Sequence, residues 1–299
     1  MDIATNYNTP IVAVARSISY ERVQARLVIY DLGAKRQSPE FAVRYDSGGR
    51  RLALSRDGQC CFVGCYKVHG IAAHSALDGA ELWRRKDLKA VQRVDAFPFD
   101  EAVFCGREGA GHLLCAKTGR TIEKPRGVKS VYCSPFSKQV VVSARSLEVH
   151  SPFGTRIGRI NRTTFAELDC CFSESEILIT ESGGDLRCFD LNSLELLWTH
   201  KFQHTGGHFV ELGFSQALGC FVGMHWHYGD STKPGMRIVH FECRTGLIIR
   251  ELQLDTTSRH TFCLGGTAVF TEDLRLVSVE TGSVIHEFIQ PHQHDDHTA

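Results

Sequence analysis

The sequence has no excess of charge of either sign and no long apolar run. Its 34 Lys and Arg residues equal its 34 Asp and Glu residues, which argues against the cationic surface that nucleic-acid binding needs. No apolar stretch reaches the roughly 18–20 residues of a membrane-spanning helix. The first residues, MDIATNYNTP, lack the basic start and apolar core of a signal peptide. We therefore expect a cytoplasmic chain whose partners are neither nucleic acid nor membrane.

The sequence also lacks a CxxC pair, although it contains 12 cysteines. Most of these cysteines lie in short apolar runs such as QCCFVGCY and LDCCFS, where a free thiol behaves as a small buried hydrophobe. Vicinal pairs occur at Cys60-Cys61 and Cys170-Cys171. Neighbouring side chains of a strand point to opposite faces, so we expect reduced, buried thiols and no vicinal disulfide.

Familiar catalytic motifs are absent as well. There is no G-x-S-x-G elbow and no P-loop, and GREGAG joins two strand-like runs where a dinucleotide site needs a strand followed by a helix. The carboxylates are dispersed, and no pair of them stands out. These absences favour a protein without enzymatic activity.

The chain does contain an internal repeat of about forty residues. Turn pairs such as DG, TG, FG and NS recur near residues 32, 78, 118, 153, 192, 245 and 281, each between two short apolar strands. Two more strand-like runs precede most of these hairpins, as in RRLALSRDGQ followed by CCFVGCYKV. The composition of residues 74–94 also suits a helix, but Gly79 and the repeat favour strands.

Four short strands per unit, repeated seven times, predict an all-β fold: a single seven-bladed β-propeller with four antiparallel strands per blade. The innermost strand of the first blade must come from residues 2–9 or be absent. A polar tail at 291–299 is expected to be disordered, and residues 1–290 form the propeller. The predicted blades are 1–44, 45–88, 89–126, 127–162, 163–203, 204–254 and 255–290.

Several of these units resemble known repeat families. Tyr30-Asp31 and Phe189-Asp190 stand where WD-repeat blades carry their Trp-Asp pair, and ALDGAELWRR resembles the D-x-TG-x-x-LW signature of quinoprotein-like propellers. No blade has the full Gly-His and Trp-Asp set, so the hydrogen-bonded tetrad of WD repeats is not implied. The resemblance implies a propeller, and it carries no ligands for a bound quinone.

Histidines gather near the end of one predicted strand, in GMHWHYGDSTKPGM. Two kinds of connection lie on one face of a propeller: those between blades, and those between the second and third strands of each blade. We call this face the upper face. The topology places His204, His208, His225, His227 and Asp230 there. Alternation points His225 and His227 to the same side of their strand, which is one geometry for a divalent metal such as zinc. Polar packing of these histidines at a blade rim is the simpler interpretation.

Two connections on the upper face are enlarged, at residues 17–25 in the first blade and Gly229–Gly235 in the sixth. Enlarged loops on a rigid scaffold are common sites of binding residues. We therefore predict a monomeric, non-enzymatic scaffold that binds a protein partner and needs no cofactor. By analogy of fold, it could be a bacterial immunity-type inhibitor. The alternatives are a propeller enzyme, or a binder of metal or small ligands that uses the histidines. The predicted partner-binding residues are Tyr20, Glu21, Arg22, His204, His208, Trp226, Tyr228, Asp230 and Lys233; the predicted metal ligands are His225 and His227.

Overall fold

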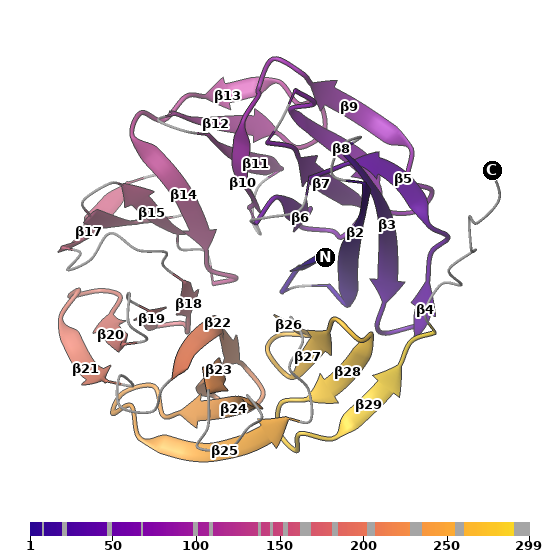
Figure 1. Ribbon diagram of the computed structural model, residues 1–299. Helices are drawn as coiled ribbons and strands as arrows, with labels where there is room; N and C mark the ends of the chain where they lie inside the picture. The colour runs from indigo at the N-terminus through magenta and orange to yellow at the C-terminus, as the bar shows by residue number, and fades with distance from the viewer. Residues whose placement is uncertain are drawn as a thin grey trace.

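The chain forms a ring of seven antiparallel β-sheets around a central axis (Figure 1). The coordinates are a computed structural model, which describes residues 1–7, 9–19, 23–46, 50–66, 68–97, 101–107, 110–136, 139–143, 146–151, 155–161, 169–180, 185–201, 207–227, 235–254 and 260–289. Of residues 19, 129, 139–143 and 227 only the backbone is described. Every regular element in these ranges is a strand, and none of them holds a helix with the length and apolar character needed to cross a membrane.

Each sheet is one blade and is built from one continuous segment of chain, so the all-β propeller prediction is confirmed. Blade 1 contains β1 (Asp2–Thr5), β2 (Ile11–Ser19), β3 (Gln24–Asp31), β4 (Arg36–Gln37) and β5 (Phe41–Arg44); blade 2, β6 (Leu52–Leu54), β7 (Cys60–Gly64), β8 (Ile71–Ser75) and β9 (Glu81–Arg85); blade 3, β10 (Val91–Ala96), β11 (Ala102–Arg107), β12 (Ala110–Cys115) and β13 (Thr121–Glu123); blade 4, β14 (Val128–Cys133), β15 (Gln139–Ser143), β16 (Ser146–His150) and β17 (Arg156–Asn161).

The remaining three blades follow the same plan, with the first strand innermost and the fourth outermost (Figure 1). Blade 5 contains β18 (Cys170–Phe172), β19 (Glu176–Thr180), β20 (Leu186–Asp190) and β21 (Leu196–His200); blade 6, β22 (Gly207–Ser215), β23 (Cys220–His227), β24 (Gly235–Phe241) and β25 (Ile248–Leu254); blade 7, β26 (His260–Cys263), β27 (Ala268–Thr271), β28 (Arg275–Ser278) and β29 (Val284–Glu287). The region considered for a helix is the β8–β9 hairpin, and the predicted tail lies outside the described residues.

Blade 1 departs from the four-strand prediction because it has five strands. Its outer edge is divided: β4 pairs with β3 at Tyr30, and β5 pairs with β3 from Leu27 to Gln24. Pro39 lies between the two short strands, and proline has no N–H to donate to a ladder. The inner strand of this blade is β1, within the range that the sequence allowed.

The ring closes between blades 7 and 1 by side-chain contacts, and no strand among the described residues is shared between these two blades. The fully buried Tyr30 ring lies 5.1 Å from the rings of Phe270 and Phe288. On the channel side, Thr5 Oγ1 donates a hydrogen bond to the Phe262 carbonyl at 2.8 Å. Aromatic pairs in this geometry add to the energy of apolar burial.

Neighbouring blades lock together at glycine turns. In blades 2, 3 and 6, the glycine between the third and fourth strands has a φ near +70° and lies against an aromatic ring of the preceding blade. The three pairs are Gly79 with Phe41, Gly119 with Trp83, and Gly246 with Trp198. The indole N–H groups of Trp83 and Trp198 also donate to carbonyls of the neighbouring turn, Ala116 at 2.7 Å and Cys243 at 2.8 Å. Each of these contacts between blades therefore needs both the backbone freedom and the small size of glycine.

All 12 cysteines are free thiols, and nine of them are buried. Cys60-Cys61 and Cys170-Cys171 lie in strands β7 and β18 as expected, and neither pair forms a disulfide. Burial raises the pKa of most of these thiols, as it does for Cys105, to about 12, so they stay protonated and unreactive near neutral pH.

Candidate functional site

A cavity of about 1140 Å³ occupies the centre of the ring. The inner strands of all seven blades line it: β1, β6, β10, β14, β18, β22 and β26. Because these strands run from the upper face to the lower face, residues near their starts lie at the upper end of the cavity. Several charged side chains gather at that end.

Arg50 and Asp169 form an ion pair across the channel. Arg50 precedes β6 of blade 2 and Asp169 precedes β18 of blade 5, so the pair joins blades that are not neighbours. Arg50 Nη2 lies 2.7 Å from Asp169 Oδ1, and Asp169 Oδ2 accepts the backbone N–H of Leu212 at 2.8 Å. Burial lowers the pKa of Arg50, but its neighbours, Asp169 first and then Tyr132 and Glu211, together outweigh burial and the net shift is upward. Arg50 therefore remains charged.

A second ion pair lies beside the first, on blade 3. Arg93 Nε contacts both carboxylate oxygens of Asp95, at 2.8 and 2.7 Å, and Arg93 Nη1 donates to the Tyr132 hydroxyl at 2.9 Å. The guanidinium carbons of Arg93 and Arg50 lie 4.1 and 5.7 Å from the centre of the Tyr132 ring. Burial raises the pKa of Tyr132, while the two arginines lower it. The phenol thus links two cations at favourable cation–π distances.

Glu211 adds a carboxyl group from blade 6. The β22–β23 pairing shifts register between Phe209 and Glu211, a β-bulge of the kind that redirects side chains. Glu211 Oε1 accepts hydrogen bonds from the Thr261 hydroxyl at 2.7 Å and from the Phe262 N–H at 3.2 Å. Burial, and next the charge of Asp169, raise the pKa of Glu211 to about 8. This carboxyl group therefore holds its proton for much of the time near neutral pH.

The lower end of the channel is aromatic. Tyr7 follows β1 of blade 1, yet its hydroxyl donates to the Phe214 carbonyl of blade 6 at 3.0 Å. Its ring lies 6.1 Å from that of Phe136, which lies 5.8 Å from the ring of Phe214. The cavity is thus charged at its upper end and apolar at its lower end.

The structure describes two of the predicted partner-binding residues, His208 and Trp226. They face each other in the β22–β23 ladder, and both line the upper part of the cavity. His208 is exposed and Trp226 is half-buried. The other seven lie outside the described residues: Tyr20, Glu21, Arg22, His204, Tyr228, Asp230 and Lys233.

The predicted metal ligands lie on β23. His225 is fully buried, accepts a hydrogen bond from Arg237 Nε at its Nδ1 (3.3 Å), and packs edge-on against Phe209 at 4.9 Å. The His227 backbone pairs with Gly207 and Gly235. Within the described ranges, no three His, Cys, Asp or Glu side chains are placed to hold a metal ion. The contacts of His225 are those of a packed histidine, and the metal site stays a prediction.

Sequence reasoning missed the charged end of the channel. The carboxylates looked dispersed because Asp169 lies 74 residues after Asp95 and Glu211 lies 42 residues after Asp169, which is about two repeat periods and one. One signal was present: polar residues recur in or just before the innermost strand of blades 2, 3, 5 and 6. These residues are Arg50, Arg93, Asp169 and Glu211. Equivalent positions on blades of a closed ring converge at the axis, so this pattern could have identified the cluster.

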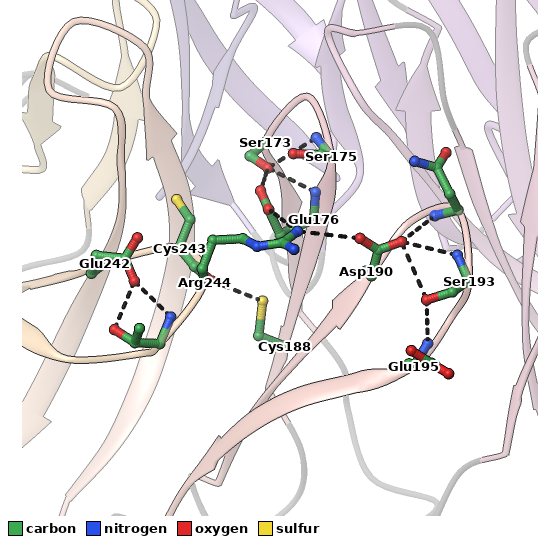
Figure 2. Close-up of polar contacts among 12 residues, drawn as sticks. Ser173, Ser175, Glu176, Cys188, Asp190, Ser193, Glu195, Glu242, Cys243 and Arg244 are labelled. Carbon is green, nitrogen blue, oxygen red and sulfur yellow. Dashed lines mark hydrogen bonds and ion pairs between the residues drawn. The ribbon is translucent and has the colours of Figure 1, made fainter.

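A separate polar cluster on the lower face connects blades 5 and 6 (Figure 2). Arg244 Nη1 lies 3.3 Å from both Glu176 Oε1 and Asp190 Oδ2, and Ser173 donates to Glu176. Cys188 Sγ donates to the Cys243 carbonyl at 3.6 Å. Because these groups satisfy one another between adjacent blades, we interpret the cluster as a structural clamp.

No protein-family model matches the chain, and no curated protein matches it in sequence. Solved structures do match. The β-propeller domain of Cps50 (Swd1) from Myceliophteria thermophila is 14% identical, with a TM-score of 0.65, over 94% of this chain and 93% of that one. A chain of the mitotic checkpoint complex is 12% identical, with a TM-score of 0.66, over 90% and 84%. BamB from Moraxella catarrhalis is 14% identical, with a TM-score of 0.54, over 95% and 83%. At these identities the likeness shows the fold alone: a β-propeller that resembles WD-repeat and quinoprotein-like proteins.

Proposed function

We propose that the chain is a protein-interaction scaffold that binds its partner through the upper face. The observation that carries this proposal is the set of apolar side chains exposed there on blades 1 and 2. Ile18 lies near the end of β2, and Tyr66 and Val68 lie between β7 and β8, with 46% and 61% of their surfaces exposed. Exposed aromatic and aliphatic side chains on rigid loops are typical of binding surfaces.

Three cationic side chains lie near this apolar group, together with the Asp46 carboxylate, which accepts the backbone N–H of Tyr66. Arg44, Arg84 and Lys86 lie at or just beyond the ends of the outer strands of blades 1 and 2. These three cations act on His69: burial lowers the pKa of its side chain most, and the three positive charges lower it further. A partner with apolar and acidic side chains fits such a surface, because complementary charge speeds association and discriminates between partners.

The predicted residues of blades 1 and 6 belong to the same proposal. Tyr20, Glu21 and Arg22 belong to the connection between β2 and β3, close to Ile18 in the chain. His208 and Trp226 extend the proposed surface to blade 6. Support also comes from the similar chain in the mitotic checkpoint complex, which places one such propeller within a protein assembly. Lack of enzymatic activity is part of this proposal.

The proposal is tested by affinity capture from a lysate of the native cell, using the wild-type protein and two variants. Val68→Asp places a carboxylate in the proposed surface. Leu77→Asp makes the same change in the same blade on the lower face, where Leu77 is 86% exposed. We expect one partner to be retained by the wild type and by Leu77→Asp and to be lost with Val68→Asp. Equal capture by both variants, or equal loss, would contradict use of the upper face.

A narrower form of the proposal is the immunity-type inhibitor. It requires the captured partner to be an enzyme whose activity falls as the complex forms. Titrating the purified partner with wild type and with Val68→Asp measures this directly. An active complex would reject the inhibitor while leaving the scaffold proposal intact.

A further inference from the structure

We propose that the upper end of the central cavity binds a small organic acid, whose carboxylate is held by Arg50 with Glu211 as a second hydrogen-bond donor. The proposed site lies inside the channel and does not include Ile18, Tyr66 or Val68 of the partner surface, although His208 and Trp226 line the same cavity.

The two aspartates of the cluster are already paired with arginines. Both oxygens of Asp95 accept from Arg93 Nε. Asp169 uses one oxygen for Arg50 and the other for the Leu212 N–H. A cationic ligand would therefore meet carboxylates whose charge is already balanced by Arg50 and Arg93, in charge-assisted bonds that are among the stronger hydrogen bonds in proteins.

Arg50 has donors to spare. A guanidinium group carries five N–H donors, and the ion pair of Arg50 joins its Nη2 to Asp169. The Arg50 side chain is 46% exposed, and the residue lines the cavity. Its planar fork matches the two oxygens of a carboxylate. Arg93, in contrast, is engaged by both Asp95 and Tyr132.

Glu211 lies close enough to Arg50 for the charge of each to shift the pKa of the other. One oxygen of Asp169 contacts Arg50, and the other contacts the backbone of Leu212, the next residue after Glu211. Among the described ion pairs, Arg50 joins Asp169 and not Glu211. Glu211 Oε1 already accepts from Thr261 and Phe262, so a protonated carboxyl group offers an O–H for a ligand oxygen. A carboxylate can therefore contact both residues.

The remaining wall suits the organic part of such a ligand. Tyr132, Leu212 and Val94 line the same cavity, and its volume of about 1140 Å³ leaves room for a small organic acid. Channels that combine a few convergent polar groups with apolar walls are typical of small-molecule sites.

Binding should depend on pH through Glu211. The titratable or charged groups that act on it, or on which it acts, are Asp169, Arg50 and Cys263, and His208 and His260 also line the cavity. Loss of the Glu211 proton removes a donor and adds a negative charge. Carboxylate affinity should therefore fall as pH rises from 6.5 to 9, by at most about tenfold per pH unit.

The test is isothermal titration calorimetry of the full chain with acetate, succinate and benzoate, and with benzylamine as the cation matched to benzoate. We expect at least one carboxylate to bind at pH 6.5 and benzylamine not to bind. Arg50→Gln should weaken carboxylate binding at least tenfold. Glu211→Gln keeps an uncharged donor, so it should retain binding and lose the pH dependence. Arg244→Gln, which removes a cation from the lower face, is the control and should bind as the wild type does.

Other outcomes overturn the proposal. Benzylamine binding that strengthens with pH and disappears in Glu211→Gln would make the cavity a cation site. Unchanged carboxylate binding in Arg50→Gln would place the anion elsewhere. Should Arg50→Gln fail to fold, Arg50→Lys keeps the charge but loses the fork, and the proposal requires weaker binding there as well. Absence of binding by all three carboxylates would reject the site.

Discussion

The Glu211 carboxyl group makes the stability of the protein depend on pH. Its pKa rises from 4.5 to about 8 on folding, so between these values the folded state holds more protons than the unfolded state. The free energy of unfolding contributed by this group must then fall as pH rises through that window, by at most about 1.4 kcal/mol per pH unit. We expect the difference between wild type and Glu211→Gln to show this slope in urea denaturation from pH 5 to 9.

The matched control for this measurement is Glu242→Gln. Glu242 lies in an exposed turn, where hydrogen bonds from Thr245 lower its pKa. That contribution is present above the ordinary carboxyl pKa and is lost only as pH falls below it. Its difference from wild type should therefore be flat between pH 6 and 9. A flat difference for Glu211→Gln as well would mean that the carboxyl group is ionised throughout and that the pKa argument is wrong.

The turns of blade 6 separate two effects of glycine. Gly219 and Gly246 both have positive φ, 61° and 71°. A Cβ at Gly219 meets nothing within 4 Å, whereas at Gly246 it would lie 2.5 Å from the Trp198 ring. Gly219→Ala should cost about 1–2 kcal/mol from backbone strain alone. Gly246→Ala should cost about 2–4 kcal/mol, because overpacking adds to that strain. Equal losses in chemical denaturation would show that Trp198 moves aside freely.

The strands and turns were the features best predicted from the sequence, because local residue patterns determine them. Asp78-Gly79, Thr118-Gly119 and Thr245-Gly246 each connect the third and fourth strands of a blade as the repeat indicated. The divided edge of blade 1 was not predicted, although Pro39 was visible, because proline alone does not tell whether an edge strand ends or resumes. The aromatic partner of each glycine comes from the preceding blade, so no local pattern revealed it.

The channel cluster belongs to the level of the whole ring. Arg50 and Asp169 are separated by more than a hundred residues, and only closure of seven blades brings them within 2.7 Å. The histidines near residue 225 drew attention because they are adjacent in sequence, yet His225 is packed against Phe209 and Arg237. The histidines that are adjacent in sequence thus lie at the rim of one blade. The charged residues that converge in the channel are far apart in sequence, because they come from different repeats.

Closure of the ring by side-chain contacts leads to a prediction for the whole molecule. Tyr30 is fully buried between Phe270 and Phe288 at the junction of blades 1 and 7, so Tyr30→Ala should cost about 3–5 kcal/mol. Each blade of a closed ring supports two neighbours, and an opened junction should weaken them all. We therefore expect hydrogen exchange to accelerate in β19 of blade 5, which borders neither blade 1 nor blade 7, as well as in β2 and β27. Leu77→Ala, at an exposed turn, should change none of these rates. Acceleration confined to blades 1 and 7 would show instead that the blades unfold independently, as in open repeat arrays.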